Sequence, residues 1–249
     1  MADRDEADLT RMVGPDADAE VPGADPVVPG ALNLRDVGGL RAGDRVTRHG
    51  VLFRSGNLAR LDAAGTRALA ELRLRRIIDL RGDEEVAREP SRLDGIDLVT
   101  QRVPLFLGSV ESFFRDDISL DEMYRRLIEE SSTGVVEVVR GILADQPVLV
   151  HCTVGKDRTG VIVALTLAAA GVDAEAVVAD YARTERLLPE RRNRAVIELL
   201  RKMHPEAVHV EDLATRSPAP VMRSLLSDVL VRYGSADDYL RAHGLADDE

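Results

Sequence analysis

The stretch HCTVGKDRTG, from His151 to Gly160, contains residues whose types and spacing can do chemistry. It holds the only cysteine of the chain, Cys152, and one of the two lysines, Lys156. Arg158 follows the cysteine after five intervening residues. A single cysteine cannot form an internal disulfide, so its thiol is either inert or a nucleophile that reacts as the thiolate. The residue types around Cys152 favour the nucleophile.

Two apolar segments flank this stretch and must position it. Residues 147–151 (PVLVH) predict a buried strand, and residues 159–171 (TGVIVALTLAAAG) predict an apolar helix that ends at Gly171. The turn between them then directs backbone N–H groups inward and adds the positive end of the helix dipole, which makes a cradle for phosphate. Gly155 lets the backbone bend, and Gly160 lets the helix begin close to the loop.

The same cradle is expected to stabilise the Cys152 thiolate, with help from Arg158. Arg158 can also bind two phosphoryl oxygens at once, which a lysine cannot do. The hydroxyl of Thr159 can donate to the sulfur and help it leave in a second step. The predicted phosphate-binding residues are Thr153, Val154, Gly155, Lys156, Asp157, Arg158 and Thr159.

The loop resembles the C-x5-R phosphate loop of the cysteine-dependent protein tyrosine phosphatases, with a histidine before the cysteine and a threonine after the arginine. Four further stretches are similar to a bacterial tyrosine/serine phosphatase branch of that family, so the resemblance covers residues 31–245. They are LNLRDVGGL (32–40), LFRSGNLARLD (52–62), IIDLR (77–81) and VVADY (177–181). The resemblance implies removal of phosphate from phosphotyrosine, and also from phosphoserine, phosphothreonine or phosphoinositides, through a phosphocysteine intermediate and without a cofactor.

The general acid departs from the family pattern. Many tyrosine phosphatases use the aspartate of a Trp-Pro-Asp loop, and this chain has no tryptophan. Three candidates are therefore open, namely Asp157, Asp116 and Asp117. We favour Asp157, either as the acid or as the group that orients the leaving oxygen or the attacking water. Residues 104–132 precede the cysteine loop. Segments of this kind are more often packed connections than lids over a site, so we expect a packed connection here.

The rest of the chain predicts an α/β fold with a central, mainly parallel sheet flanked by helices and a C-terminal helical layer. The strands are expected at 50–54, 75–80, 97–105 and 147–151. A helix is expected at 62–74 with Asp62 as its N-cap, and the last helix is expected to open on Ser235. Residues 1–30 are acidic and predicted to be a disordered tail, and residues 31–249 a single phosphatase domain.

Charge and composition exclude several functions. The net charge of −11 and an aromatic content of 3% argue against nucleic-acid binding. Residues 31–81 carry eleven arginines and five acidic residues. These arginines form either a surface that faces an anion or the solvated faces of helices and loops. No apolar run approaches the ~18 residues of a membrane span, and the N-terminal residues do not have the pattern of a signal peptide. A cytoplasmic location is therefore expected, and export without a signal peptide stays open as the alternative. No set of cysteines and histidines has metal-ligand spacing.

Two pairs of charged residues near the strand ends have two possible roles. They are either structural ion pairs or groups that act beside the bound phosphate. The pairs are Arg35 with Asp36 and Asp79 with Arg81, and Asp36 and His151 are included as supporting site residues. The alternative function is a phosphate-binding module that captures phosphorylated partners without turnover. Sulfur transfer and thiol-relay reduction fit less well, because the loop ends in Arg-Thr-Gly and there is no second cysteine.

Overall fold

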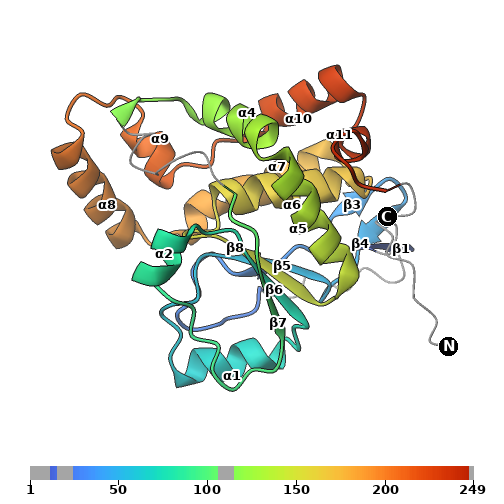
Figure 1. Ribbon diagram of the computed structural model, residues 1–249, viewed down its shortest axis with the longest axis horizontal. Helices are drawn as coiled ribbons and strands as arrows, with labels where there is room; N and C mark the ends of the chain where they lie inside the picture. The colour runs from blue at the N-terminus through green and yellow to red at the C-terminus, as the bar shows by residue number, and fades with distance from the viewer. Residues whose placement is uncertain (1–11, 16–24, 106–114, 247–249) are drawn as a thin grey trace.

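The computed structural model describes residues 12–15, 25–105 and 115–246. Its centre is a five-stranded sheet in the order β2-β5-β8-β6-β7, in which the last four strands are parallel and β2 is antiparallel to β5 (Figure 1). The strands are β2 (Arg35–Asp36), β5 (Leu52–Ser55), β8 (Val148–His151), β6 (Arg76–Asp79) and β7 (Val99–Arg102). The predicted mainly parallel sheet is confirmed. Strand β7 is shorter than expected, although the backbone N–H groups of Val103 and Leu105 still donate to the carbonyls of Asp79 and Leu80 beyond its end.

Helices cover both faces of this sheet. Helix α1 (Ala63–Glu71) lies alone below the sheet in Figure 1, and α5 (Ser132–Ala144) and α6 (Asp157–Ala169) lie on the opposite side. Asp62 caps α1 by accepting a bond from Gly65 N at 2.8 Å, as predicted. Helix α5 contains four valines, which favour strands, yet its Val135, Val136, Val138 and Val139 side chains are all buried in the core.

The C-terminal helices confirm the predicted helical layer, and the first and the last of them pack on α6. They are α7 (Ala174–Leu187), α8 (Glu190–Met203), α9 (Val210–Thr215), α10 (Ala219–Tyr233) and α11 (Ala236–Ala242). Helix α4 (Leu120–Glu130) packs beside α10, and the short α2 (Asp83–Arg88) follows β6. Ser235 caps α11 as expected. The larger hydrophobic core lies between the sheet and these helices, and a smaller one lies under α1.

Part of the segment predicted to be an acidic tail packs on the domain. Strand β1 (Val13–Pro15) joins β4 (Arg45–Thr47) and β3 (Arg41–Ala42) in a three-stranded antiparallel sheet. Met12 is buried in the larger core, and Val28 is buried in the smaller one. Apolar side chains inside an acidic stretch are what tie these residues down. Residues 1–11 and 16–24 lie outside the described part of the chain.

Candidate active site

Cys152 begins the loop between β8 and α6, as the sequence predicts. The backbone N–H of Gly155 donates to the Cys152 sulfur at 3.3 Å, and the cysteine is 3% exposed. Gly155 has φ +73°, and a Cβ there would lie 2.3 Å from the carbonyl oxygen of Ser55. The loop therefore requires glycine at this position on two counts, and the resulting close approach directs a backbone donor at the sulfur.

The guanidinium of Arg158 is held by a carboxylate that sequence reasoning missed. Glu85 on α2 accepts from Nη1 at 2.7 Å and from Nη2 at 2.8 Å, and it also accepts from the hydroxyl of Thr153. Burial opposes ionisation of Glu85, but these donors lower its pKa to about 2. Burial likewise opposes the charge of Arg158, and the bond to Glu85 and the proximity of Cys152 raise its pKa above the usual value. Both groups are charged at neutral pH.

Only part of the Glu85 contact is visible in the sequence. The run of acids after the strand at residues 83–85 is typical of a helix N-terminus, and Glu85 does bond back to Gly82 N at 3.0 Å. Nothing in that pattern links Glu85 to an arginine 73 positions later. The pairing depends on the parallel neighbours β6 and β8, whose carboxyl ends meet at one edge of the sheet.

Asp157, the favoured acid, is the first residue of α6 and lies in a small polar network. The Tyr124 hydroxyl donates to its Oδ1 at 2.8 Å, and the Lys156 ammonium donates to the same oxygen at 2.7 Å. Tyr124 is fully buried and shares a 2.7 Å hydrogen bond with the hydroxyl of Tyr181. Burial, followed by the charge of Asp157, raises the pKa of Tyr124 well above its usual value, so Tyr124 is a neutral donor. Within the described chain, no hydrogen bond reaches Oδ2 of Asp157.

The Lys156 side chain does not serve the phosphate loop in the predicted way. Its ammonium is buried, and besides Asp157 it donates to the carbonyls of Asp212 at 3.2 Å and Arg216 at 2.9 Å, at the end of α9. Three acceptors satisfy the three N–H donors of an ammonium group. The backbone N–H is the group of Lys156 left to meet a phosphate, and the side chain ties α9 to the loop.

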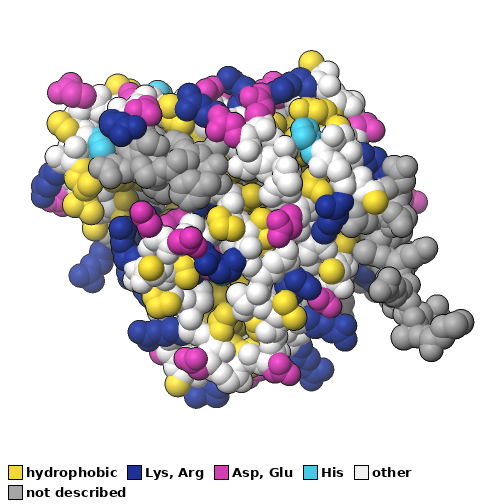
Figure 2. All heavy atoms as spheres, viewed as in Figure 1, with side chains coloured by type: hydrophobic (Ala, Val, Ile, Leu, Met, Phe, Trp, Pro, Cys, Tyr) yellow, Lys and Arg dark blue, Asp and Glu magenta, His cyan; other side chains and the backbone are white. Residues whose placement is uncertain are grey.

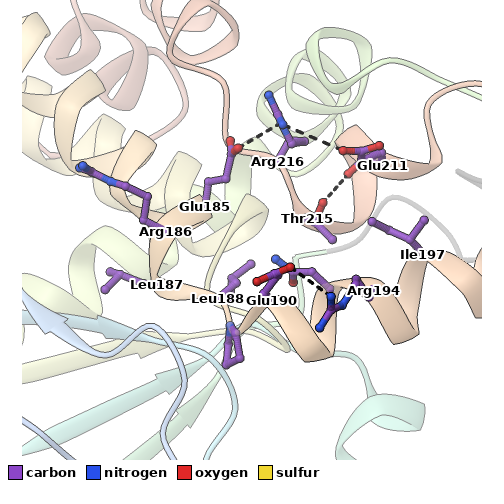
Figure 3. Close-up of a pocket in the computed structure, with 12 residues that line it drawn as sticks. Glu185, Arg186, Leu187, Leu188, Glu190, Arg194, Ile197, Glu211, Thr215 and Arg216 are labelled. Carbon is purple, nitrogen blue, oxygen red and sulfur yellow. Dashed lines mark hydrogen bonds and ion pairs between the residues drawn. The ribbon is translucent and has the colours of Figure 1, made fainter.

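A groove of about 540 Å³ lies beside that end of α9, between the end of α7, α8 and α9 (Figure 3). Figure 3 shows Arg216 between Glu185 and Glu211, with which it forms ion pairs at 3.2 and 4.0 Å. Arg194 pairs with Glu190 at 3.3 Å on the facing helix. These basic groups of the groove are neutralised by neighbouring acids, and Cys152 is not among its lining residues. The groove is therefore distinct from the cysteine loop.

The other two acid candidates are engaged elsewhere. Asp117 accepts from the backbone N–H of His209 at 2.8 Å, and this bond lowers its pKa. Asp116 pairs with Arg115 at 3.1 Å on the surface. The segment that carries both continues into α4, whose Tyr124 and Leu127 side chains are buried, so α4 is packed against the domain. Residues 106–114, which belong to the same predicted connection, lie outside the described residues.

Asp36 does not support the cysteine loop, which corrects the prediction made for it. Its carboxylate accepts from the N–H groups of Gly38 at 2.8 Å and Gly50 at 2.7 Å and contacts His49 at 3.2 Å, so it fixes a turn. Arg35 pairs with Asp180 at 2.7 Å and not with Asp36. Successive residues of a strand point to opposite faces, which separates Arg35 from its neighbour.

Asp79 and Arg81 form an ion pair, one of the two alternatives left open for them, with an Nη2–Oδ2 distance of 2.7 Å. His151 lies 3.8 Å from Asp79 and is fully buried, and burial lowers its pKa, so it is neutral at pH 7. The Thr159 hydroxyl is buried and has no hydrogen-bond partner in the described part of the chain. Gly160 lets Tyr181 approach α6, because a Cβ at that position would lie 3.0 Å from its ring.

The arginine-rich stretch 31–81 contributes to the interior as well as to the surface. Its Arg35, Arg54 and Arg81 are at most 1% exposed. Figure 2 shows Lys and Arg side chains interspersed with Asp and Glu over the visible face, without a broad basic surface. In residues 12–15, 25–105 and 115–246, no helix is long and apolar enough to cross a membrane. Those same ranges contain no group of three His, Cys, Asp or Glu residues that could hold a metal ion.

The site combines a candidate nucleophile at the end of a central parallel strand, a loop of inward N–H groups and a helix N-terminus with an arginine. These features define a cysteine phosphate-loop protein. The chain belongs to the tyrosine phosphatase family, whose model matches residues 26–249. It is 32% identical over 267 residues to the triple specificity protein phosphatase PtpB of Mycobacterium tuberculosis, covering 88% of this chain and 94% of that one. It is 32% identical over 208 residues to a tyrosine-protein phosphatase of Nostoc commune, covering 79% and 70%.

Solved structures resemble the chain less closely. The core catalytic domain of the PP-IP phosphatase SIW14 from S. cerevisiae is 17% identical, with a TM-score of 0.40 over 75% of this chain and 92% of that one. P. aeruginosa TpbA is 19% identical, with a TM-score of 0.39 over 76% and 92%. Values at this level add nothing to the assignment, which depends on the family match.

Proposed function

We propose that this protein removes phosphate from phosphotyrosine, and from phosphoserine, phosphothreonine or phosphoinositides, through a phosphocysteine intermediate. The observation that carries the proposal is the Gly155 N–H bond to the Cys152 sulfur at 3.3 Å, with Arg158 held beside it. This is the arrangement that a thiolate and a phosphate dianion both need. The range beyond phosphotyrosine is supported by the triple specificity named for the mycobacterial relative.

The reaction proceeds in two displacements at phosphorus. In the first, the Cys152 thiolate attacks phosphorus, the ester P–O bond breaks and Asp157 gives a proton to the leaving oxygen. In the second, water attacks phosphorus, the P–S bond breaks and Asp157 takes a proton from that water. The loop N–H groups and Arg158 bind the three phosphoryl oxygens throughout. Thr159 donates to the departing sulfur.

The test is turnover of three substrates side by side, namely a phosphotyrosine peptide, a phosphoserine peptide and a short-chain phosphoinositide. We expect metal-independent release of phosphate from all three, fastest from phosphotyrosine because an aryl oxygen is the better leaving group, and inhibition by vanadate. Release from phosphotyrosine alone would narrow the proposal to that substrate. Vanadate binding with no turnover of any of the three would instead identify a phosphate-binding module and overturn the proposal.

Asp157→Asn is expected to slow hydrolysis of the phosphotyrosine peptide by about 10²–10⁴-fold, the usual contribution of general acid–base catalysis. Tyr124 and Lys156 both occupy Oδ1, so proton transfer is assigned to Oδ2, and an amide cannot perform it. Para-nitrophenyl phosphate has a better leaving group and should be slowed less. The measurement is kcat for both substrates in the variant and in the wild-type protein.

Asp117→Asn is the matched control, because it removes a carboxylate that bonds only near α9. Its kcat for both substrates should stay within about twofold of wild type, as for most surface substitutions. A leaving-group effect in Asp117→Asn, or equal slowing of both substrates in Asp157→Asn, would show that Asp157 does not protonate the leaving oxygen.

A further inference from the structure

Hydrogen-bond donors from outside the cysteine loop bind the backbone carbonyl oxygens of consecutive loop residues. The Asn33 amide donates to Gly155 O at 2.8 Å and to Val154 O at 3.3 Å. The guanidinium of Arg54 donates to Gly155 O at 2.9 Å. Asn57 binds the remaining carbonyl, that of Thr153, through its backbone N–H at 3.1 Å and its amide at 3.2 Å. Three consecutive carbonyls of the loop are thus held from one side.

Holding these carbonyls also aims the N–H groups that follow them. In a planar trans peptide the C=O and the N–H of the next residue point in opposite directions. The bond from Asn33 to Val154 O therefore turns the Gly155 N–H the other way, and that N–H is the one that donates to the Cys152 sulfur at 3.3 Å. By the same geometry, the bonds to Gly155 O turn the Lys156 N–H toward the anion side of the loop.

The conformation of Asn33 suits this task. Asn33 is 5% exposed and has φ +57°, in the left-handed region that only glycine and, less often, asparagine or aspartate adopt readily. Its Oδ1 accepts a bond from Nη1 of Arg35, so the amide nitrogen is the end that faces the loop. A strained backbone at a buried polar residue that bonds a candidate active-site loop is typical of positions held in place for function.

A single carboxylate orients both arginines behind the loop. Asp180 on α7 accepts from Nε of Arg35 at 2.7 Å and from Nη1 of Arg54 at 2.8 Å, and all three side chains are nearly inaccessible to solvent. Burial and then the charge of Arg54 lower the pKa of Arg35 to about 10, so it is still charged at pH 7. Two positive charges against one negative charge leave a buried positive charge behind the loop, which favours an anion in front of it.

We propose that Asn33, Arg54 and Asp180 form a loop clamp that aims the backbone N–H groups at the sulfur and at bound phosphate. They are positioning residues, and their role rests on the proposed function of the cysteine loop. The clamp joins segments that lie far apart in the chain, since Arg54 and Asp180 are 126 positions apart, and none of its members needs to touch the substrate.

The first test uses Asn33→Gly, which tolerates the left-handed backbone but removes the amide. We expect vanadate inhibition of the full-length protein to weaken by about tenfold or more, the effect of losing a hydrogen bond to a charged centre. Because Cys152 is the only cysteine, iodoacetamide reports on it alone. The ratio of its alkylation rate at pH 6 to that at pH 9 should fall by a similar factor, and this ratio cancels changes in access.

Asp180→Asn should act in the same direction, since the amide keeps one acceptor oxygen but loses the negative charge that both arginines share. Its matched control is Asp145→Asn, which removes another carboxylate paired with an arginine, Arg76, at the opposite end of strand β6. The control should keep the wild-type vanadate inhibition and alkylation ratio. If Asn33→Gly does not fold, Asn33→Asp, which fits the same backbone but cannot donate, takes its place.

The outcomes separate the clamp from the proposed function. The Asn33 and Asp180 variants could fold and melt at lower temperatures, yet keep vanadate inhibition and alkylation ratios within about twofold of wild type. That result would show a purely structural role for these residues and overturn the clamp. Wild-type protein that binds vanadate but releases no phosphate from any substrate would overturn the proposed function, and weakened vanadate binding in the variants would still support the clamp.

Discussion

Replacement of Cys152 by serine is expected to abolish phosphate release, with kcat for para-nitrophenyl phosphate falling by more than about 10⁴-fold. A serine hydroxyl in this loop is protonated at neutral pH. The neighbouring His151 does not serve as its base, because Nε2 of the ring faces Asp79 and Nδ1 contacts the carbonyl of Cys152. The loop N–H groups that remain can bind a phosphate but cannot displace it. The measurement is steady-state release of para-nitrophenol by the wild-type and variant proteins.

The same variant should still bind substrate. Gly155, Arg158 and Glu85 are unchanged in Cys152→Ser, so we expect the dissociation constant for a phosphotyrosine peptide to stay within about tenfold of the wild-type KM, and the melting temperature to change little. Activity above about 1% of wild type in the variant would contradict nucleophilic catalysis by Cys152. Loss of both activity and binding together with a large drop in melting temperature would indicate a folding defect, which Cys152→Ala would then test.

Arg158→Lys is expected to lower kcat by about 10²–10³-fold although it keeps the positive charge, comparable to the loss of an oxyanion donor. Glu85 binds one end of the guanidinium through Nη1 and Nη2. Nη2 also donates to the Thr153 hydroxyl at 3.3 Å, whereas Nε makes no hydrogen bond within the described chain. Nε, together with Nη2 once it releases that long bond, forms an edge that can meet two phosphoryl oxygens. A lysine ammonium cannot bind Glu85 through two parallel bonds and also present such an edge.

Glu85→Gln separates positioning of Arg158 from its charge. The amide keeps one acceptor oxygen for Arg158 but cannot accept a bond at both ends, so we expect a smaller loss than in Arg158→Lys, seen mainly in kcat. The measurement is kcat and KM for the phosphotyrosine peptide in both variants. Wild-type kcat in Arg158→Lys would show that a point charge suffices and that the fork geometry is unimportant.

The cysteine loop is the part of the site that the sequence predicts best, because its members are consecutive. Strand, turn and helix signals surround Cys152, and the direction of the loop N–H groups follows from local geometry alone. Glu85, Asn33 and Tyr124 could not be found in this way. Each of them reaches the loop through the packing of another element, and the chemistry of a lone glutamate or asparagine in the sequence does not indicate which arginine or carbonyl it meets.

In the fold too, elements set by local sequence patterns were predictable, and elements set by packing between distant segments were not. Strands β5, β6 and β8 were expected, because short apolar runs between helices predict parallel strands. Helix α5 was not, since its valines favour strands and only burial against the sheet makes it a helix. Asp36 shows the same limit, because its place beside Arg35 in the sequence left an ion pair between them open, whereas both side chains bond to other partners.

The late position of Asp180, Asp212 and Arg216 in the chain has a consequence for biosynthesis. The growing polypeptide completes strand β8 and the nucleophile before it contains the carboxylate shared by Arg35 and Arg54, or the carbonyls that bind Lys156. Chains are made from the N-terminus, and domains fold as units. A nascent chain that ends before residue 180 would therefore lack the loop clamp, and we expect its cysteine loop to bind anions more weakly until the C-terminal helices leave the ribosome.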